Sequence, residues 1–107
     1  MTASPSHHIA SLQIAATHPA LAGHFPGRPI VPGVVLLDGV LQAAREWLGE
    51  RLELQSLAQA KFSAPLLPEE CASIQLTLQE AQLRFVITRD TQTIAQGVMH
   101  IVVGAQR

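Results

Sequence analysis

The amino-acid sequence predicts an α+β fold in which one long helix packs against one face of an antiparallel sheet. A single apolar helical stretch closes the first half of the chain. After it the hydrophobic period changes to two, and alternating segments follow one another through short turns. Strands joined in this way pair as antiparallel hairpins, and their apolar face needs the helix as cover. The 107 residues fit one domain, which we place at residues 1–107.

The region before the helix is predicted as a first strand and a long irregular connection. The mixed apolar pattern of residues 9–14 favours a strand. Residues 17–32 carry four of the seven prolines, and within them residues 19–22 suit one helical turn. A connection this long is usually functional or disordered. Its apolar side chains indicate an ordered, packed loop.

The helix is predicted over residues 33–50. Pro32 suits the first helical position, because the amide that proline lacks would have no helical partner there. Apolar side chains cover nearly the whole circumference of the first three turns, which predicts burial on most sides. Charged residues such as Arg45 and Glu46 appear only towards the end, where we expect the helix to reach solvent.

Four further strands are predicted after the helix. The first covers residues 52–64 and is ended by Pro65 and Pro68. Residues 72–80, 83–88 and 94–103 alternate between apolar and polar or small side chains, and residues 89–92 form the turn between the last two.

Composition bounds the possible functions. Hydrophobic residues make up 48% of the chain and charged residues 14%, and about 25% charged is usual in soluble domains. A shortage of polar surface predicts that another subunit covers part of the exterior. The net charge is −1, with one Trp and no Tyr, which gives little support to nucleic-acid binding.

Several patterns predict a soluble, cytoplasmic protein. Cys71 is the single cysteine, so no intramolecular disulfide can form, as in a reducing compartment. Residues 1–16 lack the basic start of a signal peptide. The apolar residues 30–44 are too short and too interrupted to span a membrane. No metal ligand cluster is evident around His7, His8 or His18, which we take as tail and loop residues.

Residues 23–38 combine three groups that can act on one substrate. Asp38 lies in the most apolar part of the helix, where a buried charge needs a partner. It either faces a water-filled gap, bonds a backbone amide, or is catalytic. His24 alone would be weaker evidence still, because a lone histidine in a loop is more often a surface or hydrogen-bonded residue. The Gly33 amide begins the helix, where unpaired N–H groups favour developing negative charge. A base, an oxyanion site and an acid thus lie close in sequence.

This stretch resembles the β-hydroxyacyl-acyl-carrier-protein dehydratases of the hotdog-fold superfamily. Residues 23–38 run GHFPGRPIVPGVVLLD, which follows the signature His-Phe-Pro-Gly-x-Pro, then Pro-Gly-Val, then an acid. Residues 61–68 run KFSAPLLP, which is similar to the second block of the family. Small variants with this motif occur in gene clusters for aryl polyenes, and the chain looks at least as similar to those. The family's Pro-Gly-Asp after this block is Pro68-Glu69-Glu70 here, which alters that turn.

The resemblance implies a hotdog fold, with a long central helix wrapped by a curved antiparallel sheet. It implies a homodimer with one continuous sheet, or else a higher oligomer or heterodimer, and active sites at the interface. By carry-over, His24 and Asp38 are the catalytic pair and come from opposite subunits. The Gly33 amide would hold the thioester carbonyl, and Phe25 and Val34 would line the substrate site. Arg28 would meet the carrier protein, or be an ordinary exposed loop arginine.

The function implied is that of a lyase, a 3-hydroxyacyl-[acyl-carrier-protein] dehydratase of fatty-acid or polyene-type lipid biosynthesis, without a cofactor. It would convert 3-hydroxyacyl thioesters on acyl carrier protein to trans-2-enoyl thioesters. An imidazole suits removal of the α-proton, a helix N-terminal amide suits the enolate-like oxygen, and a carboxyl group held protonated by apolar surroundings suits the departing hydroxyl. Asp38 matches the branch that also isomerises the double bond, which one residue does not establish.

Two other classes stay open. A hotdog thioesterase would hydrolyse the same kind of substrate, and it would have the helix acid without the His-Phe-Pro-Gly loop. A non-catalytic hotdog subunit would bind acyl carrier protein or complete a heterodimer. Among the remaining candidates, His100 is predicted to be structural and Cys71 to be a small packing residue. Phe62 lines either the core or the acyl tunnel.

Overall fold

The computed structural model describes residues 6–21 and 30–104 of the chain. They form one helix, α1 (Gly33–Leu48), and the strands β1 (Ser6–Leu12), β2 (Leu52–Phe62), β3 (Ala72–Gln79), β4 (Gln82–Arg89) and β5 (Gln92–Val103). A single turn of 3-10 helix, Pro19–Leu21, lies between β1 and α1. The predicted order of elements is confirmed.

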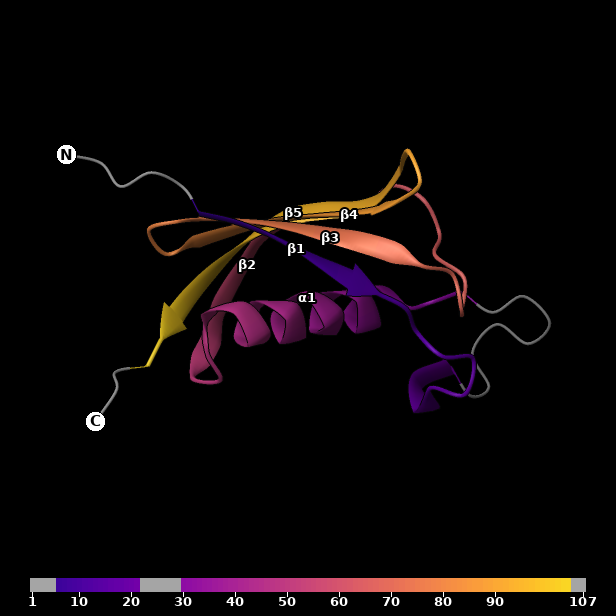
Figure 1. Ribbon diagram of the computed structural model, residues 1–107, viewed down its shortest axis with the longest axis horizontal. Helices are drawn as coiled ribbons and strands as arrows, with labels where there is room; N and C mark the ends of the chain where they lie inside the picture. Colours follow the sequence, from indigo (N-terminus) through magenta and orange to yellow (C-terminus); the bar gives the residue numbers. More distant parts are fainter. Residues whose placement is uncertain (1–5, 22–29, 105–107) are drawn as a thin grey trace.

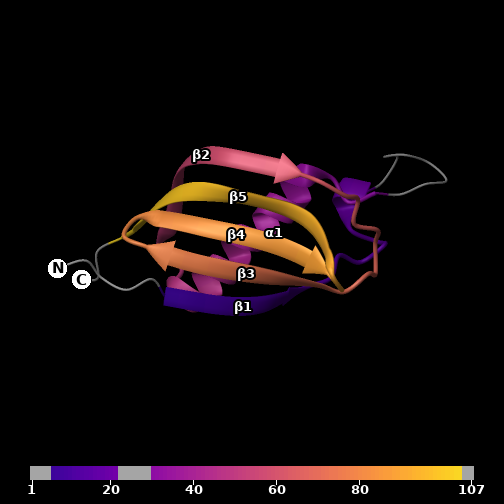
Figure 2. The same ribbon diagram turned by 90° about the horizontal axis from the view of Figure 1, so that it is seen from above.

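The five strands form one antiparallel sheet in the order β1-β3-β4-β5-β2. Figure 2 shows this order face on, with α1 behind the sheet, and Figure 1 shows the helix lying along one face. Strands β1 and β2 are the two edges. The predicted α+β arrangement, with a helix against an antiparallel sheet, is confirmed.

Several strands begin or end at other residues than predicted. Residues 89 and 92 pair with each other, so the loop between β4 and β5 is only two residues long, and Asp90 takes a φ of 56°. The strand predicted at residues 9–14 instead spans Ser6–Leu12, because the chain leaves the sheet after Leu12 pairs with Ala72.

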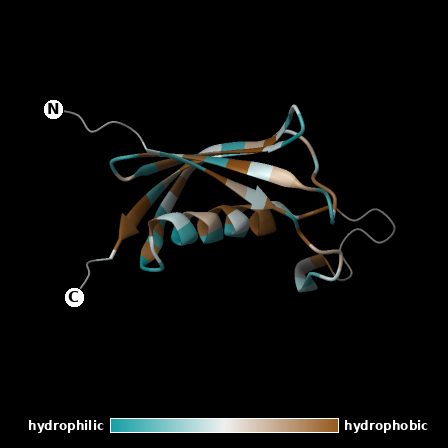
Figure 3. Ribbon diagram, in the orientation of Figure 1, coloured by the Kyte–Doolittle hydropathy of each residue, from teal (hydrophilic) through white to brown (hydrophobic). Residues whose placement is uncertain are grey.

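The core lies between α1 and the facing side of the sheet. From the helix it takes the buried residues Val35, Leu36, Val40, Ala43 and Ala44. The sheet supplies alternate residues of its central strands, which are all at most 3% exposed: Ile74, Leu76, Leu83, Phe85, Ile87, Met99 and Ile101. In Figure 3 the hydrophobic colouring of the helix concentrates at its N-terminal end.

The helix is buried on one side, and the predicted burial on most sides is wrong for a single chain. Val34 is 74% exposed, and Asp38 and Gln42 are also exposed. The sheet can cover only the face of the helix that points towards it. Pro32 is the N-cap residue, one position before the helix instead of the first residue inside it, and its carbonyl accepts from Val35 N at 3.0 Å.

Edge strand β2 is exposed along nearly its whole length, and only Leu52 is buried. Leu54, Leu57 and Phe62 on this strand are between 40% and 49% exposed. Two register shifts interrupt its pairing with β5. Opposite them, a Cβ on Gly97 would lie 2.1 Å from the Gln59 carbonyl oxygen, so only glycine fits at this close approach of two backbones.

Within the described ranges, no helix is long and apolar enough to cross a membrane.

Candidate active site

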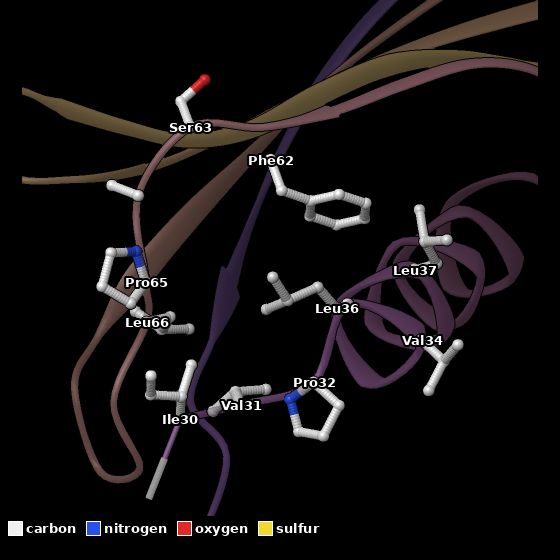
Figure 4. A pocket seen from close by; sticks show the side chains of 12 residues that line it. Ile30, Val31, Pro32, Val34, Leu36, Leu37, Phe62, Ser63, Pro65 and Leu66 are labelled. Carbon is white, nitrogen blue, oxygen red and sulfur yellow. The ribbon is translucent and has the colours of Figure 1, made fainter. Parts of the chain in front are cut away.

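An apolar cavity of about 690 Å³ lies at the start of α1. One wall is residues 30–34 with Leu36 and Leu37, and the other is Phe62 with the segment up to Leu66. Figure 4 shows the two walls facing each other, with the Ser63 side chain turned away from the cavity. The Val31 N–H donates to the Leu66 carbonyl at 2.9 Å and joins the walls at one end. The two motif blocks of the sequence therefore meet around one cavity.

Gly33 lies against the ring of Phe62. A Cβ built on Gly33 would lie 2.9 Å from the ring's Cζ, so a larger residue would have to displace the ring. The first amides of an α-helix have no carbonyl partner within the helix. Here they lie beside an open cavity with apolar walls, and preorganised N–H groups of this kind stabilise a negative charge that develops next to them. The helix start can hold an oxyanion.

Asp38 lies in a different place, a cleft of about 360 Å³ between α1 and the chain that follows β1. Its Oδ2 accepts from Gln42 Nε2 at 3.3 Å. The polar lining of the cleft consists of Ser11, Gln13, His18, Asp38, Gln42 and Glu46. The apolar wall expected around Asp38 is not found in the single chain. In the single chain the carboxylate faces an open polar cleft.

The amide of Gly33 and the carboxylate of Asp38 do not share a cavity within one chain. The apolar cavity and the polar cleft have no lining residue in common. The N–H groups at a helix start point along the helix axis, whereas the Asp38 side chain leaves the helix sideways, about 7.5 Å further along the axis. Within the described part of one chain, the two groups therefore face separate spaces.

The other predicted site residues divide between described and masked parts of the chain. His24, Phe25 and Arg28 lie outside the described residues. Val34 is present at the rim of the apolar cavity and is mostly exposed. Phe62 lines the cavity and is 49% exposed, so it belongs to the cavity wall and not to the core.

Three other histidines lie on strands, and Cys71 lies directly before β3. His7 Nδ1 lies 3.2 Å from Thr77 Oγ1 on the neighbouring strand, and the ring of His8 stacks on that of Trp47 at 5.1 Å. His100 is half-buried on β5, and Cys71 is exposed, so its predicted packing role is wrong. The described ranges contain no group of three or more residues that could hold a metal ion.

Two residues at the cleft were missed by sequence reasoning. Gln42 follows Asp38 by four positions, a spacing that brings helical side chains together and that was available as a signal. Glu69 makes three hydrogen bonds to residues 13–16, more than fifty positions away. Its only signal was its place in the turn where the family pattern has glycine.

Comparison with known proteins shows similarity to dehydratases over most of the chain. The family model of the ApeI-like proteins, described as ApeI dehydratase, matches residues 1–98. A 3-hydroxyacyl-[acyl-carrier-protein] dehydratase FabZ of Haemophilus influenzae (strain PittEE) is 34% identical over 86 residues, which are 73% of this chain and 57% of that protein. A FabZ of Chlamydia trachomatis is 34% identical over 76 residues, or 63% and 50%. The chain thus spans about half the length of these curated relatives.

Solved structures show the fold. The dehydratase heterocomplex ApeI:P from Xenorhabdus doucetiae superposes with a TM-score of 0.80 at 26% identity, and covers 94% of this chain and 96% of the other. An (R)-hydratase from A. caviae has a TM-score of 0.74 at 16% identity, with 92% and 95% covered, and shows the fold alone. The chain has the hotdog fold and belongs to the ApeI-like dehydratase family.

Proposed function

We propose that this chain supplies half of an active site that dehydrates 3-hydroxyacyl thioesters on acyl carrier protein to trans-2-enoyl thioesters, for fatty-acid or polyene-type lipid biosynthesis in the cytoplasm. The observation that carries the proposal is the start of α1, where the Gly33 amide lies beside an apolar cavity under Phe62. The names of the FabZ relatives support the choice of substrate.

Each group has one task in the proposed reaction. His24 removes the α-proton of the thioester, and the charge that moves to the thioester oxygen is stabilised by the Gly33 amide. Asp38, in its protonated carboxyl form, then gives its proton to the hydroxyl at carbon 3, which leaves as water while the double bond forms. The step ends with the α-proton on His24 and with Asp38 as a carboxylate, and transfer of that proton back to Asp38 restores the site. The acyl chain lies in the apolar cavity, because most of its wall consists of the carbon atoms of apolar side chains.

The proposal requires two copies, because Gly33 and Asp38 of one chain line separate cavities. The exposed edge of β2 supports such an assembly. It has a backbone edge open to further pairing and the apolar side chains of Leu54, Leu57 and Phe62. We propose that the β2 edges of two copies pair into one continuous sheet, and that Asp38 of one copy meets His24 of the other.

A complementation experiment tests both parts. His24→Ala and Asp38→Asn proteins are each expected to be inactive in an assay that follows the conjugated enoyl product. If the two residues come from opposite subunits, randomly paired chains of the two variants regain about a quarter of the activity, since half of the dimers then hold one intact site out of two. No regained activity would assign both residues to one chain.

The same assay separates the other function classes. Release of free thiol from the acyl thioester by the unmodified protein would identify a thioesterase. An unmodified protein that binds acyl carrier protein but turns over no 3-hydroxyacyl or enoyl thioester would be a binding subunit. Product from a chain with a partner added, and none from the chain alone, would point to a heterodimer.

A further inference from the structure

The turn between β2 and β3 is tied to the end of β1 through one residue, Glu69. Its backbone N–H donates to the Ile14 carbonyl at 2.8 Å. Its carboxylate Oε2 accepts from Ala16 N at 2.9 Å, and its carbonyl accepts from Gln13 Nε2 at 2.8 Å. The pairing of β1 with β3 stops at Leu12. Glu69 therefore holds the chain where the sheet no longer does.

The segment that Glu69 holds is a wall of the Asp38 cleft. Residues 13–15 line the cleft opposite the side chains from α1. The helix is fixed by the core, so the width of the cleft depends on how residues 13–16 are fixed. Ile14 packs against the core, and the three hydrogen bonds of Glu69 hold the residues on both sides of it, so they help to fix the wall opposite the carboxylate of Asp38.

The turn itself is anchored to the sheet. Glu70 Oε1 accepts from Leu67 N at 2.8 Å and from Arg89 Nη1 on β4 at 3.0 Å. Arg89 Nη1 also donates to the Pro65 carbonyl at 2.9 Å. Glu69 stands next to these bonds, so the wall of the cleft is connected through it to a central strand.

Glutamate is an unfavourable residue for the backbone at this position. Glu69 has a φ of 71°, in the left-handed region that suits glycine. Glycine would keep both backbone hydrogen bonds and lose only the bond from Ala16 N to the carboxylate. That bond is therefore what the strained glutamate adds. Strained residues that persist beside a site indicate a role in it.

We propose that Glu69 is a positioning residue, whose carboxylate fixes the cleft wall against which Asp38 protonates the leaving hydroxyl. The proposal rests on the proposed function of Asp38. It assigns to the altered turn, Pro68-Glu69-Glu70, a role in the site through residues 13–16.

Three variants test the proposal by activity. In Glu69→Gly the backbone is relaxed, and we expect kcat to fall on the order of tenfold with KM and the melting temperature nearly unchanged, because small misplacements at a site are costly for turnover. Glu69→Gln keeps an acceptor for Ala16 N and should retain kcat. Glu80→Gly is the matched control: Glu80 is exposed, has a φ of 57° and lies in the turn between β3 and β4, away from the cleft. It should leave kcat unchanged.

Hydrogen exchange tests the contact without any substrate. The Ala16 amide is expected to exchange on the order of tenfold faster in Glu69→Gly than in Glu69→Gln, since it loses its acceptor. Unchanged exchange, an unchanged kcat in Glu69→Gly, or an equal loss in Glu69→Gln would overturn the positioning role. If the unmodified protein turns over no thioester, the proposed function fails and with it the role of Glu69 in turnover, whereas the exchange result still decides whether the carboxylate holds Ala16.

Discussion

The cavity beside Gly33 and the cleft beside Asp38 belong to the same helix and differ in nearly every property. The cavity is lined by apolar side chains, and its notable polar group is a backbone amide. The cleft is smaller and lined by histidine, carboxylate, amide and hydroxyl groups. One suits an acyl chain and a thioester oxygen, and the other suits proton transfer to a hydroxyl. Within one chain, α1 thus lines two separate spaces of opposite polarity with different stretches of its surface.

Removal of the acid tests whether the cleft takes part in the chemistry. Asp38→Asn should lower kcat by on the order of 100-fold or more, because general acid catalysis is lost. The melting temperature should stay the same, since the carboxylate is exposed and the contact described above is with Gln42. Glu46→Gln in the same cleft is the control. An equal loss in that variant would mean that the cleft needs negative charge in general and not Asp38.

Gly33 of α1 lines the apolar cavity, and Gly39 lines the cleft at the contact of α1 with Leu12. Gly33→Ala places a Cβ against the Phe62 ring and should lower kcat by about tenfold, because it disturbs the oxyanion site. The double variant Gly33→Ala/Phe62→Ala should regain part of the lost kcat. Gly39→Ala meets Leu12 Cδ1 at 2.8 Å. We expect it to lower stability instead, by about 1–3 kcal/mol, through overpacking. Thermal melts and kinetics on both variants compare them; a loss of stability in both would remove the distinction.

Phe62→Ala alone should change which acyl chains are accepted. Removing the ring enlarges the apolar cavity, so kcat/KM for longer acyl chains should rise relative to short ones by a few-fold, about 1 kcal/mol of differential binding. Leu67→Ala is the control, an exposed apolar residue that does not line the cavity. The same ratio of long-chain to short-chain kcat/KM in Phe62→Ala and the unmodified protein would place the acyl chain elsewhere.

The smallest effect is expected for Gln42→Leu. Its amide donates one hydrogen bond to Asp38 from an exposed position, and loss of such a bond is worth about 0.5–1.5 kcal/mol. We expect kcat to fall about threefold, without loss of stability. Gln75→Leu, on the exposed outer side of β3, is the control. A fall as large as that of Asp38→Asn would give Gln42 a direct part in catalysis.

The fold followed from local patterns, and parts of the site did not. The alternation of residues 72–80 and 94–103 and the apolar run after Pro32 correspond to β3, β5 and α1, because period and sheet face are linked along each strand. The exposure of Val34 and Asp38 was not predictable from the same run. Sequence shows how many sides of a helix are apolar, but not which side a sheet covers. The hydrogen bond from Ala16 N to Glu69 joins two segments that are far apart in the sequence, and hydrophobic periodicity cannot predict such a contact.

The stack of His8 on Trp47 has a use that the catalytic groups do not share. Trp47 is the sole tryptophan of the chain. Its fluorescence therefore reports on one contact, between β1 and the C-terminal part of α1. Emission from that indole should change when β1 separates from α1, without any label. If binding of a carrier protein, a substrate or a second copy changes the contact between β1 and α1, the change can therefore be measured from tryptophan fluorescence alone.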